Sequence, residues 1–326
     1  MAINSKPLDF VYEPVLTDLD RVQGKLIDIA MNQPFHLSKQ VDHVVSNLGK
    51  GIRPVITLLA SKFHSNDGLM AEIMATAVEL LHVATLVHDD TVDKADMRRG
   101  VATVSKLWDQ NTAVLIGDYI FARSATLVCE TNNVRVIKRF AETIMELSSG
   151  QLNELARAYK WPQTQDQYLD CISLKTASLF ETSSETGAIL SGADEKLIDA
   201  LKRYGRNLGM AFQIIDDILD IYGSENETGK PIGQDLVHGI ITLPSLLAIN
   251  KSVGKNPIAN MFKNPKDENL VAESIQFIQD QHVADECYQI ARNYCDNALA
   301  ALNVLESNKY KESLIELVTY VVNRWN

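Results

Sequence analysis

Apolar residues recur along most of the chain at the spacing of an α-helix. The same periodicity predicts helices over about 53–63, 112–130, 133–160, 166–190, 195–221, 242–251, 284–306 and 311–325. In the stretch 67–90 the apolar positions share one helical face, and they are Leu69, Ile73, Ala77, Leu80, Ala84 and Val87. Asp67 suits the N-cap of that helix. Strand signals are sparse, because no alternating run is bounded by an Asn-Gly or Asp-Gly turn.

Turn-forming residues separate these helices without dividing the chain. Breaks are predicted at 161–166, 191–194, 222–235 and 253–269, where Gly, Pro, Asn and Asp gather. None of these segments is rich enough in Pro, Gly or Ser to link two domains. We therefore expect one all-α domain over residues 1–326, built as a bundle of about ten or more helices.

Composition narrows the class of protein. Among 326 residues, 31 are Lys or Arg and 42 are Asp or Glu, for a formal net charge of −11. An acidic chain without a basic run is a poor nucleic-acid binder. No apolar run approaches the roughly 20 residues of a membrane span, and the N-terminus lacks the features of a signal peptide. The four cysteines lie far apart without a CxxC pair, which favours a cytoplasmic protein with neither a zinc site nor a disulfide framework.

Two aspartate clusters interrupt the apolar pattern. HDDTVD at 88–93 is echoed by IDDILD at 215–220, and each follows a long apolar run. The first and last acids of each motif are four residues apart and so share a helical face. Like charges at this spacing, at a helix C-terminus where the macrodipole disfavours anions, destabilise a helix unless a cation compensates.

Three interpretations of these clusters compete. A solvated acidic helix end would explain one cluster, but it explains two copies after buried-looking helices less well. A calcium-binding EF-hand needs a D-x-D-x-D-G loop with a distal Glu, which neither stretch has. Carboxylates suit Mg²⁺, which completes its shell with water and phosphate oxygens, and a diphosphate can approach them only through bridging metal.

Cations near the clusters favour the third interpretation. Each could be a surface charge when taken alone, but arginine and lysine beside a carboxylate cluster are the usual readers of phosphate. The basic residues grouped in this way are Lys50, Arg53, Arg98, Arg99 and Lys230.

With these motifs the chain resembles the trans-type isoprenyl diphosphate synthases, the all-α prenyltransferases of farnesyl, geranylgeranyl and longer polyprenyl diphosphate synthesis. The resemblance covers nearly the whole chain. Besides the two DDxxD motifs, it rests on GKGIRP at 49–54, MRRG at 97–100, LKTASLF at 174–180 and ITLPSLL at 241–247. It implies an isoprenoid-synthase bundle around a deep central cavity, an enzyme that depends on Mg²⁺, and most often a homodimer.

The resemblance also assigns the two substrates to positions in this chain. The diphosphate of isopentenyl diphosphate would be held by Gly49, Lys50, Arg53, His82 and Arg99, although His82 alone would more often be a satisfied core histidine. The allylic substrate is dimethylallyl, geranyl or farnesyl diphosphate. Its side of the site would be formed by Arg98, Lys175, Thr176, Phe212, Gln213 and Lys230.

The two motifs would supply the metal ligands. Asp89 and Asp93 are implied as principal ligands with Asp90 beside them. Asp216 is implied as the third anchor, and Asp217 and Asp220 complete its motif.

One position departs from the family pattern. Many relatives have Gly-Lys-x-Thr where this chain has Gly239, Ile240, Ile241 and Thr242. A usual diphosphate contact is therefore missing at Ile240, and we expect an altered affinity rather than lost activity.

These features predict head-to-tail condensation, in which metal-bound allylic diphosphate ionises and isopentenyl diphosphate attacks the cation. Thr85 and Ala84, just before the first motif, are small where short-chain relatives place bulky aromatics, and Leu81 lies one turn deeper. We expect an open cavity, a hexaprenyl to octaprenyl product and a quinone side chain as its destination, with Ala84→Phe shortening the product. The alternative explanation for the small residues at Thr85 and Ala84 is that they merely suit tight helix packing.

Other functions remain open at this stage. The chain could be the catalytic subunit of a two-component synthase that needs a small partner, or a farnesyl or geranylgeranyl diphosphate synthase. A terpene cyclase shares the fold but has no need of the GKGIRP segment or His82, because it holds no second diphosphate. A non-catalytic helical protein would not need the full set of acids and bases.

Overall fold

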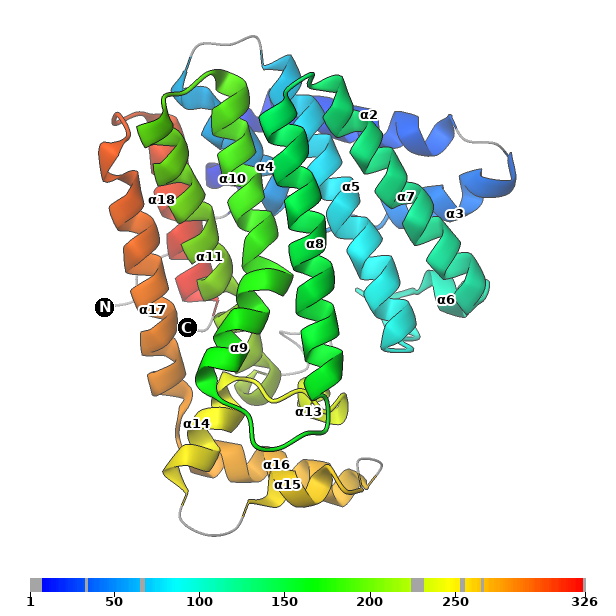
Figure 1. Cartoon of the computed structure of the whole chain (residues 1–326), viewed down its shortest axis with the longest axis vertical. Coiled ribbons are helices and arrows are strands. Elements are labelled where there is room, and N and C mark those ends of the chain that lie inside the picture. Colours follow the sequence, from blue (N-terminus) through cyan, green and yellow to red (C-terminus); the bar gives the residue numbers. More distant parts are fainter. Residues whose placement is uncertain are drawn as a thin grey trace.

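The computed structural model describes residues 8–32, 35–64, 68–223, 232–252, 256–264 and 267–324, which form an all-α bundle (Figure 1). Its α-helices are α1 (Leu8–Tyr12), α2 (Leu16–Met31), α3 (Phe35–Val45), α4 (Ile52–Ala60), α5 (Leu69–Val92), α6 (Val104–Leu107), α7 (Gln110–Glu130), α8 (Val134–Arg157), α9 (Gln165–Ile172), α10 (Ser178–Ser191), α11 (Glu195–Tyr222), α13 (Gln234–Val237), α14 (Leu243–Lys251), α15 (Pro257–Met261), α16 (Glu268–Asp280), α17 (Ala284–Ala301) and α18 (Lys309–Asn323).

Short irregular elements join these helices. They are the 3₁₀ turns η1 (Glu13–Val15), η2 (Ser61–Phe63) and η4 (Leu302–Val304), the π-helical segment η3 (Ser173–Ala177), and the antiparallel strands β1 (Met97–Arg98) and β2 (Val101–Ala102). The expected bundle of many helices is therefore confirmed, with one small hairpin added to it.

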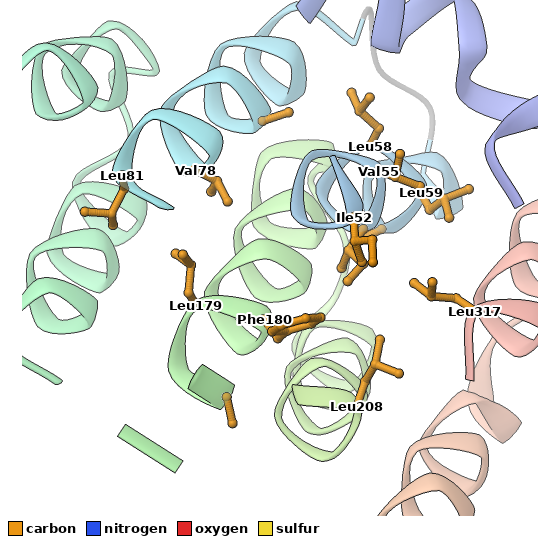
Figure 2. Packing of buried hydrophobic residues seen from close by; sticks show 14 of the residues in the cluster. Ile52, Val55, Leu58, Leu59, Val78, Leu81, Leu179, Phe180, Leu208 and Leu317 are labelled. Carbon is orange, nitrogen blue, oxygen red and sulfur yellow. The ribbon is translucent and has the colours of Figure 1, made fainter. Parts of the chain in front are cut away.

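The core lies where α4, α5, α10, α11 and α18 meet. Figure 2 shows Ile52 of α4, Phe180 of α10, Leu208 of α11 and Leu317 of α18 converging on one region, and all four side chains are buried. Helix α10 is buried on every side as far as Ile189, as expected of a helix enclosed by others. This packing fixes α5 and α11 relative to each other.

Helices α5 and α11 run in the same direction (Figure 1). Both end toward the part of the molecule where α13 to α16 gather around a second, smaller apolar cluster that includes Ile221 and Met261. The bundle thus brings the ends of the two helices that carry the aspartate motifs to the same end of the fold.

Local sequence signals explain the starts of several helices. Side chains that accept a backbone N–H cap α7, α8, α9, α11 and α18, from Asp109, Asn133, Thr164, Asp194 and Asn308. The N-cap expected at Asp67 was wrong: that residue lies outside the described part, and Gly68 occupies the N-cap of α5 with a φ of 79°.

Helices α5 and α7 are more apolar over their length than expected from the sequence. By length and composition alone, α5 and α7 are apolar enough to cross a bilayer. The apolar window of α5 is 72% buried inside the bundle, whereas that of α7 is only 39% buried. Helix α7 therefore keeps an apolar face that the rest of the described chain does not cover.

Candidate active site

The first aspartate motif lies at the C-terminal end of α5. Two of its acids face a cavity, and the third pairs with an arginine. Asp89 and Asp93 line a cavity of about 1280 Å³. Asp90 turns to Arg98, whose Nε donates to its two carboxylate oxygens at 2.7 and 2.9 Å. Burial raises the pKa of Asp89 to about 6, with Lys175 opposing the shift and Asp93 adding to it. A buried carboxylate of this kind is stabilised by a cation beside it.

The second motif, at the end of α11, is held by hydrogen bonds. Tyr168 donates to Asp217 Oδ2 at 2.6 Å, and Gln213 Nε2 donates to Oδ1 at 2.7 Å. Burial nevertheless raises the pKa of Asp217 to about 7. Asp220 accepts the backbone N–H groups of Gln234 and Asp235 at 3.1 and 3.2 Å.

Asp216 faces away from its two companions. It lines the larger cavity together with Asp89 and Asp93, whereas Asp217 and Asp220 line an adjoining cavity of about 790 Å³. The expected shared face of Asp216 and Asp220 therefore does not translate into a shared cavity. One acid of the second motif shares the larger cavity with two acids of the first.

A basic wall closes another side of the larger cavity. Lys50 lies two residues before α4 and Arg53 lies in its first turn. The guanidinium of Arg53 stacks 4.5 Å from the ring centroid of Phe180. Burial lowers the pKa of Arg53 to about 10, against the attraction of Glu79 and Asp216. Burial and the neighbouring arginines lower the pKa of His82 well below its ordinary value, so its imidazole is neutral near pH 7.

The β1–β2 hairpin presents Arg99 to the same wall. Arg99 has a φ of 52° and Gly100 a φ of 77°, which suits the paired positive φ values of a tight hairpin turn. Gly49 lets this side chain approach, because a Cβ at Gly49 would lie 2.4 Å from Arg99 Nη2. The hairpin turn therefore brings Arg99 against the GKGIRP segment.

Lys175 and Thr176 lie on the π-helical segment η3, between α9 and α10. Segments of this kind frequently mark functional sites in helices. Lys175 forms an ion pair with Glu154 of α8, and Thr176 Oγ1 donates to Gln213 Oε1 at 2.7 Å. Burial alone would lower the pKa of Lys175, but Glu154 and Asp89 outweigh it and raise that pKa.

The two cavities adjoin and differ in character. Both are lined by Asp93, Arg98, Arg99, Lys175 and Gln213. The larger one continues from these charged groups to an apolar part. That part is lined by Leu81, Leu86, Phe121, Ile144, Leu147 and Leu179. Such a space can hold a ligand with a strongly anionic head and a long apolar tail.

The polyprenyl synthetase family model matches residues 34–278 of this chain. The chain belongs to the polyprenyl synthetase family. It is 36% identical over 317 residues to component 2 of the heptaprenyl diphosphate synthase of Geobacillus stearothermophilus, a match that covers 97% of this chain and 99% of that protein.

Solved structures agree with the sequence match. A polyprenyl synthase from Caulobacter crescentus CB15, complexed with calcium and isoprenyl diphosphate, has a TM-score of 0.93 at 33% identity and 99% coverage of both chains. A decaprenyl diphosphate synthase from Rhodobacter capsulatus has a TM-score of 0.91 at 32% identity, covering 98% of this chain and 100% of the other. The protein is thus a prenyltransferase with the isoprenoid-synthase fold, as the sequence resemblance implied.

One expectation about the cavity of this polyprenyl synthetase was wrong. Thr85 and Leu81 line the larger cavity as predicted. Ala84 does not: it is fully buried, and it is not among the residues that line either cavity. The 100° step between consecutive helical residues turns Ala84 away from the wall on which Thr85 lies.

Lys230, expected on the allylic side, lies outside the described residues. Ile240, which replaces the lysine of many relatives, is half-buried and lines the smaller cavity with Asp217, Asp220 and Asp235. The substitution therefore removes a positive charge from a wall rich in carboxylates.

The motifs did not reveal several residues that complete the site. Glu154 pairs with Lys175, Tyr168 with Asp217, and Glu79 lies buried in the wall that holds Arg53. Glu79 carried a signal, because it is an acid in the apolar middle of a helix, three residues before His82. The others are brought to the site by distant helices, and no local pattern marks them.

Proposed function

We propose that this prenyltransferase condenses isopentenyl diphosphate head-to-tail onto dimethylallyl, geranyl or farnesyl diphosphate and depends on Mg²⁺. The observation that carries the proposal is the shared cavity of Asp89, Asp93 and Asp216 with a basic wall and an apolar extension. Two anionic heads and a growing hydrocarbon tail are the ligands that such a cavity fits.

The donor set fits magnesium. Asp89, Asp93 and Asp216, with Asp217 and Asp220 in the adjoining cavity, would hold the ions. Within the described ranges, no three His, Cys, Asp or Glu side chains gather into a ready metal site, which suits an ion that takes one or two carboxylates and completes its shell from water and phosphate. When bound, magnesium would neutralise the leaving diphosphate.

Side chains of the protein would bind and orient the two substrates. Lys175 and Arg98 lie in the wall shared by both cavities, where they can neutralise the allylic diphosphate. Thr176, fixed by Gln213, would face the carbon that ionises. Lys50, Arg53, Arg99 and neutral His82 would orient isopentenyl diphosphate so that its double bond attacks this carbon. Positioning and fixed charge supply the acceleration, and the released diphosphate accepts the final proton.

The apolar extension supports a product of medium or long chain, hexaprenyl to octaprenyl in type. Thr85 is the small residue on the wall of α5, and Leu81 lies one turn deeper. The relative named as a heptaprenyl synthase falls within this range, and the one named as a decaprenyl synthase supports a long-chain product more generally. A quinone side chain would be a suitable destination for this product, made in the cytoplasm.

A second candidate function is that of the catalytic subunit of a two-component synthase. The name of the Geobacillus relative, component 2 of a heptaprenyl diphosphate synthase, favours it. A self-sufficient homodimer is the simpler assembly, and the exposed apolar residues of α7 and α8 could serve either partner.

A product assay tests the proposal. Purified chain is incubated with Mg²⁺, labelled isopentenyl diphosphate and farnesyl diphosphate, and the dephosphorylated products are sized. Hexaprenyl to octaprenyl alcohols from the chain alone are the expected result. Products that stop at geranylgeranyl would refute the open cavity, and elongation only with an added small subunit would establish the two-component synthase.

The metal ligands are tested by Asp89→Asn, which keeps the shape of the side chain but removes its charge. We expect turnover to fall by at least about a thousandfold, the scale of losing a principal electrostatic contact. Asp199→Asn, at an exposed pair with Arg203 on α11, is the matched control. Near-normal turnover of Asp89→Asn would refute the metal assignment.

A further inference from the structure

The end of α18 reaches the larger cavity, although no motif points to it. Lys50 Nζ donates to Tyr320 OH at 2.7 Å. Four residues on, and so on the same face of the helix, Arg324 Nη2 lies 2.6 Å from Asp216 Oδ1. Its guanidinium also stacks 4.6 Å from the ring centroid of Phe212. Both Tyr320 and Arg324 line the cavity.

Arg324 has an unused hydrogen-bond donor. Its Nη1 is buried and has no hydrogen-bond partner within the described chain, and the same holds for Arg53 Nε. A buried donor without an acceptor is unfavourable, so two of them on residues that line one cavity point to an anionic ligand with several acceptor oxygens. Asp216 is the acid whose charge attracts Arg324, Arg53 and Lys50 together, and it accepts from the other terminal nitrogen of Arg324, Nη2.

Arg324 and a divalent cation compete for the same carboxylate. The guanidinium now provides the positive charge that Asp216 needs at its buried position. A metal ion on Asp216 would take over that task and would repel a guanidinium at the same oxygen. The freed side chain would remain tethered to α18, beside the basic wall of Lys50 and Arg53.

We propose that Arg324 exchanges partners during the catalytic cycle. It is the counter-ion of Asp216 in the metal-free enzyme, and it binds the diphosphate of isopentenyl diphosphate once the metal-bound allylic diphosphate engages Asp216. This inference rests on the proposed function. Because the coupling between two sites is reciprocal, Arg324 makes occupation of the allylic side favour binding of isopentenyl diphosphate.

The exchange predicts opposite effects on the two ligands when Arg324 is changed. Arg324→Gln removes the competitor of the metal, so Mn²⁺ should bind the substrate-free enzyme several-fold more tightly. The same variant removes a diphosphate contact, so the KM for isopentenyl diphosphate should rise by at least about tenfold, which corresponds to about 1.4 kcal/mol. Arg324→Lys keeps the charge and should recover part of both effects.

The experiment combines Mn²⁺ titration by electron paramagnetic resonance with steady-state kinetics. Arg292→Gln is the matched control, because this exposed arginine of α17 stacks on Tyr288 and does not line the cavity. Thermal unfolding verifies that each variant is folded. Unchanged Mn²⁺ affinity would overturn the exchange, as would an unchanged KM for isopentenyl diphosphate or an increase in the KM for farnesyl diphosphate alone.

The two proposals fail in different ways. A wild-type protein that elongates no allylic diphosphate would refute the proposed function, whereas the Mn²⁺ titration needs no turnover. Tighter Mn²⁺ binding by Arg324→Gln would therefore support the first half of the exchange by itself. Elongating enzyme with unaltered Mn²⁺ affinity in the variant would refute the exchange and leave the proposed function intact.

Discussion

At the scale of single residues, the site stores unfavourable charge in the metal-free protein. Burial raises the pKa of Asp89 to about 6 and that of Asp217 to about 7, from an ordinary value of 3.8. It also raises the pKa of Asp235 well above that value. These groups bind protons more tightly in the folded than in the unfolded chain. Their ionisation therefore lowers the free energy of unfolding, and a bound cation would offset this loss.

This charge predicts the direction of the pH dependence of stability. Above pH 7 both acids are ionised and their cost is fully present; as pH falls through about 7 and 6 they take up protons and the cost is relieved. With EDTA present, the free energy of unfolding in urea should be higher at pH 5.5 than at pH 8. Each unit of raised pKa corresponds to about 1.4 kcal/mol.

The control for this prediction is Asp217→Asn, which cannot ionise. The variant should show a smaller difference in unfolding free energy between the two pH values. Added Mg²⁺ should stabilise the wild type more at pH 8 than at pH 5.5. An identical pH dependence in wild type and variant would show that Asp217 does not carry the buried charge.

Ile240 is the residue at which this chain departs from many relatives, and its position allows a direct test. It lines the smaller cavity beside Asp217 and Asp220. Ile240→Lys would add a positive charge there, and we expect the KM for farnesyl diphosphate to fall about three- to tenfold, the effect of about 1 kcal/mol of charge attraction. The KM for isopentenyl diphosphate should stay the same.

Steady-state kinetics with each substrate varied in turn measure this effect. Ile27→Lys, on the exposed side of α2, controls for the added charge. If both Michaelis constants stay at wild-type values, Ile240 does not face the allylic diphosphate.

At the scale of elements, α5 sets one wall of the product cavity. Thr85 lies on that wall one turn above Leu81. Thr85→Phe should shorten the product, because the ring would fill the space through which the chain grows. Thr85→Val has nearly the same volume as threonine and should leave product length unchanged, whereas Leu81→Ala should lengthen the product.

Sizing of the dephosphorylated products by chromatography gives the readout. An active Thr85→Phe enzyme with products of wild-type length would mean that the chain does not pass Thr85. Ala84→Phe does not test where the product cavity ends, because Ala84 is buried away from the larger cavity and the ring would disturb helix packing instead.

Sequence periodicity predicted the long helices because each keeps one apolar face over several turns. The range predicted over 166–190 runs through α9, η3 and α10, since a π-helical segment of five residues hardly disturbs the apolar pattern. Helices α2, α3 and α16 were not predicted, and α15 lies inside the break predicted at 253–269. Two-residue strands are too short for any alternation to show. Hydrophobic periodicity detects a helix by its apolar face, and elements of only a few residues are too short to show one.

In the candidate site too, some residues were predicted from the sequence and others were not. Residues within motifs, such as Asp89, Arg99 and Lys175, were predicted from spacing and resemblance, and the fold places them around adjoining cavities. Arg324 and Glu154 were missed, because their partners lie on helices distant in sequence. Only the packing of α18 and α8 against the site shows their contacts.

At the scale of the whole molecule, helices α7 and α8 leave apolar side chains uncovered. Val114 and Leu115 of α7 and Met145 of α8 are exposed and line neither the larger nor the smaller cavity, and Figure 1 shows the two helices diverging from their shared end. Single exposed apolar residues are ordinary, but a group on adjacent helices marks an interaction surface. A second copy of the chain is the proposed occupant.

A charge placed on this surface tests the homodimer. Leu115 is 67% exposed and Met145 62% exposed, and neither lines a cavity, so Leu115→Glu and Met145→Glu should leave the fold of the single chain intact. At a dimer contact each change should weaken association by about 30-fold or more, the effect of losing about 2 kcal/mol at an anchor residue. Val304→Glu, on an exposed apolar residue of η4, is the control.

Light scattering across a concentration series should show a wild-type dimer and a dissociating variant. A wild-type monomer that elongates farnesyl diphosphate alone would refute the dimer. A monomer that becomes active only with a small subunit would assign the same surface to that partner.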